Sequence, residues 1–77
     1  KNVHYSVKLH SAFAKNIITA REIQDVLENG SVNFSRSNTK LDSCKIYVIE
    51  KVFDKKNYLI SLKNCAKEVK VFDYSFE

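Results

Sequence analysis

Methionine is absent from this chain of 77 residues. A reading frame beginning at Lys1 would need an initiator methionine, and removal of that methionine before a lysine is not expected. We therefore expect residues 1–77 to be one domain excised from a larger polypeptide; the alternative is an arbitrary boundary. A single domain of this length buries only roughly 60–65% of its unfolded surface, so its core is thin.

Long apolar runs are also missing, because no stretch approaches the roughly 20 residues that a membrane-spanning helix needs. The two cysteines, Cys44 and Cys65, are too few and too far apart for a zinc site. No carboxylate-rich cluster suggests another metal. We therefore expect neither a membrane nor a metal among the partners of this chain.

Basic residues exceed acidic ones, which gives a net charge of +4 and a pI of about 9.1. This balance favours an acidic partner, either a nucleic acid or an acidic inhibitor protein. A solvated basic surface without a partner would have the same composition.

The residues around Thr19 predict the start of a helix over residues 20–29. Thr19 and Glu22 have the spacing of a capping box, in which each side chain bonds the backbone amide of the other residue. Ile18 and Ile23 have the spacing of a hydrophobic staple. An earlier helix, over residues 6–15, is indicated by apolar residues at intervals of four.

The only glycine, Gly30, is expected to end the second helix in the left-handed conformation. Apolar and polar residues then alternate, as is typical of strands, at residues 31–35, 43–53, 58–63 and 69–76. The segments 35–40, 54–57 and 64–67 read as loops or turns. The order predicts an α+β fold with two N-terminal helices packed on one face of a twisted four-stranded antiparallel sheet.

The length of the hairpin loop decides whether the cysteines can meet. A two-residue loop at Asp54 and Lys55 would place Cys44 opposite Cys65, where a disulfide is possible. A four-residue loop would displace the pair by two positions. We favour free thiols, because a reducing cytosol is the commoner setting for such folds.

Nearly the whole chain, including the order of the four expected strands, resembles a family of small bacterial proteins. Tyr5-Ser6, residues 8–19 and the segment EIQDVLENG follow the pattern YSxHAxxRMxxRGIT…IxxxLxxG, which is similar to RelE-like toxins of the barnase–EndoU–colicin–RelE ribonuclease superfamily. The matching positions are structural. Where the family has histidine, arginine, arginine and glycine, this chain has Lys8, Ala12, Asn16 and Ile17.

The resemblance implies RNA cleavage by attack of a ribose 2′-hydroxyl on the adjacent phosphate, without metal or small-molecule cofactor. Such chemistry needs a base, an acid and cations that stabilise the phosphate. Histidine suits the proton transfers because it titrates near neutral pH. The candidate catalytic residues are His10, His4 and Lys8, although an isolated histidine can equally be structural.

Several cationic and aromatic residues could bind the substrate. Arg36 and Lys40 lie in a polar loop suited to phosphate contacts. Strand residues Lys45, Lys51 and Lys63 could add charge. Tyrosine and phenylalanine rings on an exposed sheet face could stack on bases, or they could simply form the core. The four aromatic candidates are Tyr47, Tyr58, Tyr74 and Phe72, of which we favour Tyr58 and Tyr74 because they lie near strand ends.

Together these features predict a ribonuclease toxin domain that acts on tRNA or mRNA. We expect it to be secreted or delivered as part of a larger protein, to act in the bacterial cytoplasm, and to be inhibited by an acidic immunity or antitoxin protein. The alternative is a non-catalytic module of the same fold that binds RNA, or a protein through its sheet edge. An immunity or adaptor role is a third possibility, but inhibitors of basic nucleases are usually acidic.

Overall fold

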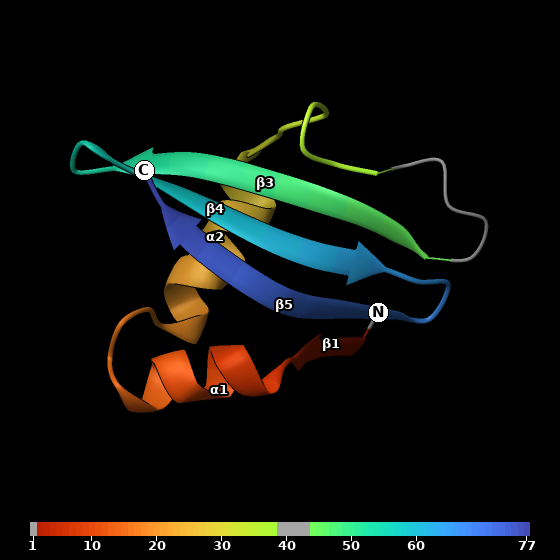
Figure 1. The fold of residues 1–77 in the computed structure, drawn as a ribbon, viewed down its shortest axis with the longest axis horizontal. Helices are drawn as coiled ribbons and strands as arrows, with labels where there is room; N and C mark the ends of the chain where they lie inside the picture. Colours follow the sequence, from red (N-terminus) through yellow and green to blue (C-terminus); the bar gives the residue numbers. More distant parts are fainter. Residues whose placement is uncertain (1, 39–43) are drawn as a thin grey trace.

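The computed structural model describes residues 2–38 and 44–77 (Figure 1). Its strands form one sheet in the order β1-β5-β4-β3-β2, with β1 parallel to β5 and the other neighbours antiparallel. The α+β class is confirmed, but the sheet is five-stranded and mixed rather than four-stranded and antiparallel. The elements are β1 (Asn2–Tyr5), α1 (Val7–Ala14), α2 (Ala20–Asn29), β2 (Ser31–Val32), β3 (Lys45–Phe53), β4 (Lys56–Asn64) and β5 (Glu68–Phe76).

The strand that the sequence did not predict is β1, at the edge of the sheet. Its residues align with the first half of β5, from Asn2 opposite Glu68 to Tyr5 opposite Val71. The backbone amide of Ser6 then donates to the carbonyl of Val71 at 2.9 Å, and the chain turns into α1. β1 therefore fixes where α1 begins beside β5.

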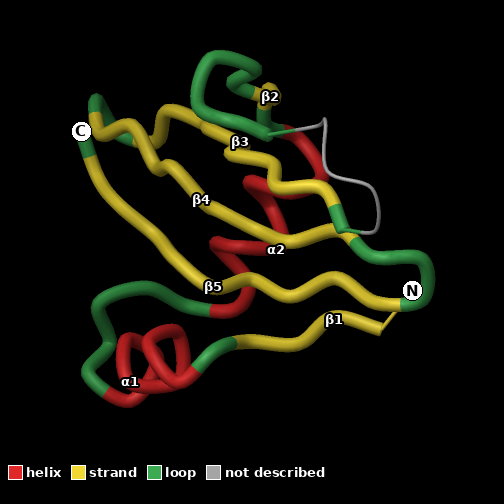
Figure 2. Tube along the Cα trace, turned by 45° about the vertical axis from the view of Figure 1, so that its right-hand side comes forward, coloured by secondary structure: helices red, strands yellow, loops and turns green. Residues whose placement is uncertain are grey.

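Both helices contribute to one core on the same side of the sheet. The capping box at the start of α2 is confirmed, because Glu22 N donates to Thr19 Oγ1 at 3.1 Å and Thr19 N donates to Glu22 Oε1 at 3.0 Å. Figures 1 and 2 show α2 behind β3 and β4, while α1 lies alongside β5. Neither described helix is long and apolar enough to cross a bilayer. The fully or almost fully buried core side chains are Leu9, Ala12, Ile18, Ile23, Val26, Ile60, Leu62 and Val71.

Gly30 ends α2 for a different reason from the one expected. Its backbone is extended, with φ −81° and ψ 177°, and is not left-handed. A Cβ atom here would lie 2.4 Å from the carbonyl oxygen of Val26 and 2.7 Å from that of Glu50. Glycine is therefore needed because the backbones of α2 and β3 approach closely, not because φ is positive.

The β3–β4 hairpin has the two-residue loop. Asp54 and Lys55 both have positive φ, 46° and 67°, and Phe53 pairs with Lys56. This register brings the Cα atoms of Cys44 and Cys65 to 4.4 Å, and the two residues form a disulfide. The favoured free thiols were therefore wrong, because the tight turn places the cysteines opposite each other.

Candidate nucleic-acid interface

The sheet has one side covered by the helices and a second side that we call the open face. Alternation along β4 directs Tyr58, Ile60 and Leu62 toward the helices and the residues between them to the open face. Pairing with β4 and β1 extends this assignment to the neighbouring strands. The open face includes His4, Ile46, Val48, Glu50, Leu59, Lys63 and Lys70.

Residues 33–38 run beside β3, where Asn38 pairs with Ile46, and extend over the half of the open face nearest the β3–β4 turn. Ser37 Oγ accepts a hydrogen bond from Val48 N at 2.9 Å, and Arg36 reaches Glu77 with an Nη2–Oε2 distance of 3.2 Å. Beneath this segment, Val48 and Leu59 are only 7% and 2% exposed. In the other half, which we call the uncovered half, the side chains of Lys63 and Lys70 are exposed.

In that uncovered half, a row of paired residues crosses four strands and contains two lysines and a histidine. His4 of β1 pairs with Lys70 of β5, Lys70 pairs with Lys63 of β4, and Lys63 pairs with Ile46 of β3. Ile46, Lys63 and Lys70, together with Phe72, line a hollow of about 290 Å³. The sequence prediction included His4 and Lys63, and the fold brings these two into the same row.

The electrostatics of the row favour an anion. Lys63 and Lys70 lie directly opposite each other, and like charges at such positions are destabilising. Within residues 2–38 and 44–77, neither ammonium forms a salt bridge. At the end of the row, His4 Nε2 lies 3.5 Å from Glu68 Oε2, with both side chains more than half exposed. A phosphate between the lysines would relieve their repulsion.

The other two catalytic candidates lie outside this row. The His10 ring on α1 makes edge-on contacts with the rings of Tyr5 and Phe13, at centroid distances of 6.3 and 6.1 Å. Tyr5 packs on the core, so its neighbour His4 points to the opposite side of β1. The two histidines therefore do not form a pair.

Lys8, the third catalytic candidate, already has a partner on β5. Its ammonium forms a hydrogen-bonded ion pair with Asp73 and lies 5.3 Å from the centroid of the Tyr74 ring. The hydrogen bond to Asp73 raises the pKa of Lys8 above its ordinary value. Lys8 thus fastens α1 to β5 and remains protonated.

Most of the predicted phosphate-binding residues are dispersed. Lys51 faces α2, where its Nζ lies 3.0 Å from Asp25 Oδ2 and 4.7 Å from the centroid of the Phe53 ring. Lys45 is exposed but projects to the helix side, and Arg36 is bound to Glu77. Lys40 lies outside the described residues. Of the described members of this group, only Lys63 lines the hollow.

The two favoured tyrosines belong to the helix side of the sheet. Tyr58 OH donates to Glu22 Oε2 at 3.0 Å, and this hydrogen bond, followed by burial, raises the pKa of Tyr58. Tyr74 packs against the core beside the ring of Phe76. Neither ring lies on the open face, where Phe72 takes the position expected of them.

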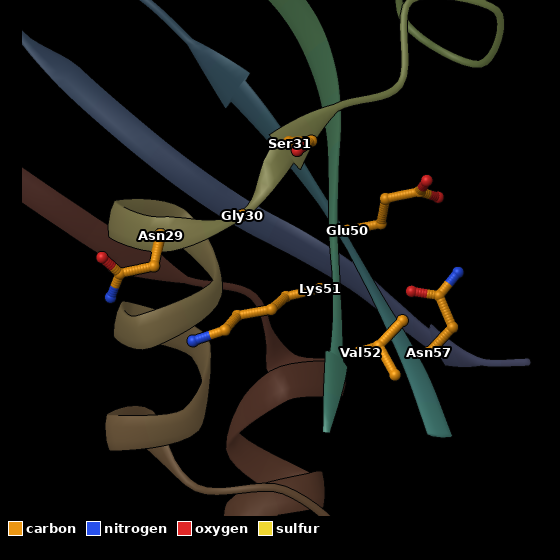
Figure 3. Close-up of a pocket in the computed structure, with 7 residues that line it drawn as sticks. All are labelled: Asn29, Gly30, Ser31, Glu50, Lys51, Val52 and Asn57. Carbon is orange, nitrogen blue, oxygen red and sulfur yellow. The ribbon is translucent and has the colours of Figure 1, made fainter. Parts of the chain in front are cut away.

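A second hollow, of about 280 Å³, lies where α2 ends and β2 begins beside β3 (Figure 3). The Lys51 side chain extends toward α2, and Glu50 and Asn57 project on the other side of β3. Asn57 Oδ1 is buried without a hydrogen-bond partner among the described residues. The acceptors and the engaged lysine make this hollow a poor phosphate site. Its lining is Asn29, Gly30, Ser31, Glu50, Lys51, Val52 and Asn57.

Sequence reasoning missed Lys70 as a site residue. Cys65 N donates to Glu68 O at 2.9 Å, so residues 66 and 67 form a tight connection between β4 and β5. Counting outward from that connection pairs Lys63 with Lys70. A two-residue loop in place of the expected turn over 64–67 would have predicted the lysine pair.

The described residues contain no group of three or more histidine, cysteine or acidic side chains placed to hold a metal ion. Among the described residues, the two opposed lysines of the open-face row are the arrangement best suited to an anion. No family model, curated protein or solved structure matches the chain, so the resemblance to RelE-like toxins stays a prediction.

Proposed function

We propose that this protein binds RNA through the uncovered half of its open face. The observation that carries the proposal is the direct opposition of Lys63 and Lys70, without a salt bridge in the described part of the chain. Such a pair costs stability in the free protein, and a bound phosphate would offset that cost. The net charge of +4 attracts polyanions generally, and the lysine pair gives the attraction a location.

Salt-dependent binding tests the proposal. Labelled RNA is titrated by fluorescence anisotropy at several salt concentrations with the wild type and with the double variant Lys63→Gln/Lys70→Gln. Each phosphate contact in a single strand contributes about 0.7 to the slope of log K against log salt. The double variant should therefore lower the slope by about 1.4 and weaken binding at low salt.

The matched control removes two exposed lysines far from the hollow, as Lys15→Gln/Lys55→Gln. Lys15 follows α1 and Lys55 lies in the β3–β4 turn. The charge change is identical, so this variant should keep most of the affinity and slope. Equal losses in both double variants would mean that only net charge matters, and undetectable binding by the wild type at low salt would refute the proposal.

A metal-independent endoribonuclease is the second candidate, favoured by His4 at the end of the lysine row. Its ring is 3.5 Å from Glu68, which could orient it as a base toward the ribose 2′-hydroxyl, while Lys63 and Lys70 hold the phosphate. An acidic inhibitor protein would then be expected to cover this row.

Cleavage is tested by incubating total tRNA with the protein in EDTA. The wild type and His10→Ala should give discrete fragments, whereas His4→Ala should give none. His10→Ala is the matched control because it removes a histidine on the other side of β1. Intact RNA in every reaction would reject the nuclease and leave the binding function.

A further inference from the structure

Phe72 differs from most of the aromatic residues of the chain. The sequence has five phenylalanines and four tyrosines. All of these rings except Phe34 and Phe72 pack against the hydrophobic core. Phe72 instead lines the hollow between the two lysines of the open face.

A β-bulge turns Phe72 to this side. Leu62 pairs with Val71, but the preceding residue, Ser61, pairs with Asp73, so Phe72 is the extra residue of β5. Without the bulge, alternation would direct Phe72 and Tyr74 to one face. The bulge breaks the alternation, so that Phe72 lies on the open face while Tyr74 lies on the core side.

Hydrogen bonds from residues beside the bulge hold it in place. Ser6 Oγ donates to the carbonyl of Phe72 at 3.2 Å, and Ser6 N donates to the carbonyl of Val71 at 2.9 Å. On the other side of Phe72, the carboxylate of Asp73 accepts from Lys8 and from the backbone amide of Tyr74. A fixed backbone thus presents the aromatic ring beside two lysines that form no salt bridge with any described residue.

From this arrangement, and resting on the proposed RNA binding, we infer that the hollow takes one nucleotide of single-stranded RNA. The base stacks on Phe72 and the adjoining phosphate lies between Lys63 and Lys70. A paired base inside a duplex already has both faces stacked, so it cannot use the ring. The site therefore selects single strands, whereas lysines alone would bind either form.

The absence of tryptophan from the chain allows a direct test. Phe72→Trp places one indole in the hollow, and its fluorescence should be quenched when a short single-stranded RNA binds but not when a duplex of equal length binds. Phe34→Trp is the matched control, because Phe34 is 73% exposed and does not line the hollow. Its fluorescence should change little with either RNA.

Affinity gives the second readout. Phe72→Leu keeps an apolar side chain but removes the ring, so single-strand affinity should fall roughly tenfold while duplex affinity changes little. Phe72→Tyr should bind as the wild type does. Circular dichroism checks the fold of each variant, and if Phe72→Leu does not fold, the tryptophan and tyrosine variants decide the question.

The outcomes separate the two proposals. Stacking would be overturned if RNA did not quench the fluorescence of Phe72→Trp and if Phe72→Leu kept the wild-type affinity for single strands. RNA binding would still stand in that case if Lys63→Gln/Lys70→Gln bound RNA more weakly than the wild type. Equal wild-type affinity for single strand and duplex would also overturn it. If no RNA binds at low salt, both proposals fail.

Discussion

Lys51 Nζ lies 3.0 Å from Asp25 Oδ2, which joins the middle of β3 to α2 across the helix side of the sheet. Hydrogen bonds from the Lys51 ammonium, and then from the Asn29 amide, lower the pKa of Asp25 below its ordinary value. A lysine that composition alone would assign to a nucleic-acid surface thus has a structural partner.

This pair predicts an acid-dependent loss of stability. Because the pKa of Asp25 is lower in the folded state, the unfolded state binds its proton more tightly, and the stabilisation is present above the ordinary pKa and lost as the pH falls through the folded value. Asp25→Asn should therefore unfold more easily than the wild type at neutral pH, and the difference should disappear in acid. Urea unfolding across the pH range measures it.

The control for that experiment is Glu28→Gln, which removes the same charge from the same helix without touching Lys51. Its effect should be small at every pH. If the free energies of unfolding of Asp25→Asn and the wild type still differed by the same amount in acid, the stabilising role given to the ionised Asp25 would be contradicted.

The lysine pair on the open face predicts opposite effects on stability and binding. Lys70→Glu replaces a repulsive cross-strand pair with an attractive one, so the free energy of unfolding should rise by about 0.5 kcal/mol. RNA affinity should fall, because the same substitution repels phosphate. Lys67→Glu, in the adjacent turn, should weaken binding less and leave stability nearly unchanged. A loss of stability in Lys70→Glu would contradict this account of the pair.

Reducing the Cys44–Cys65 disulfide should destabilise the protein by about 2–4 kcal/mol, as is usual for a cross-link that closes a loop of this length. Guanidinium unfolding with and without dithiothreitol gives the value. The unfolding midpoint of the Cys44→Ser/Cys65→Ser variant should not change when dithiothreitol is added. The same midpoint for the oxidised and reduced wild type would contradict the expected contribution.

Lys55 occupies a left-handed position that favours glycine, with φ 67°. Asp-Gly is a preferred pair for such a two-residue hairpin turn, and the left-handed conformation costs other residues about 1–2 kcal/mol. Lys55→Gly should therefore raise the midpoint of thermal unfolding, although glycine increases the entropy of the unfolded chain. Lys56→Gly, one position later in β4, should lower it. A lower midpoint for Lys55→Gly would argue against a strained turn.

The elements that the sequence predicted correctly are those with local signals. The helix after Thr19 follows from its capping box, and the three long strands follow from alternation within each segment. β1 is different, because its four residues form a strand only by pairing with β5 far along the chain. Gly30 similarly meets Glu50 across tertiary structure, so the reason for a glycine there could not be found in the local sequence.

The candidate site depends even more on contacts between distant segments, which the local sequence does not reveal. Alternation along residues 69–76 cannot reveal the bulge opposite Ser61 and Leu62, so it could not separate Phe72 from Tyr74. Charge alone could not distinguish Lys63, which lies in the hollow, from Lys51, which is bound to Asp25. Composition predicts that the protein attracts polyanions, whereas the location of the binding surface depends on the register of the strands.

The parallel pairing of β1 with β5 has a consequence for synthesis on the ribosome. Among the described elements β1 is made first, whereas β5, the strand with which it pairs, is made last. The helices and the β3–β4 hairpin can form during translation, but the edge strand must wait. Because such distant pairing slows folding, we expect β1 to dock late, and with it His4 to join the lysine row.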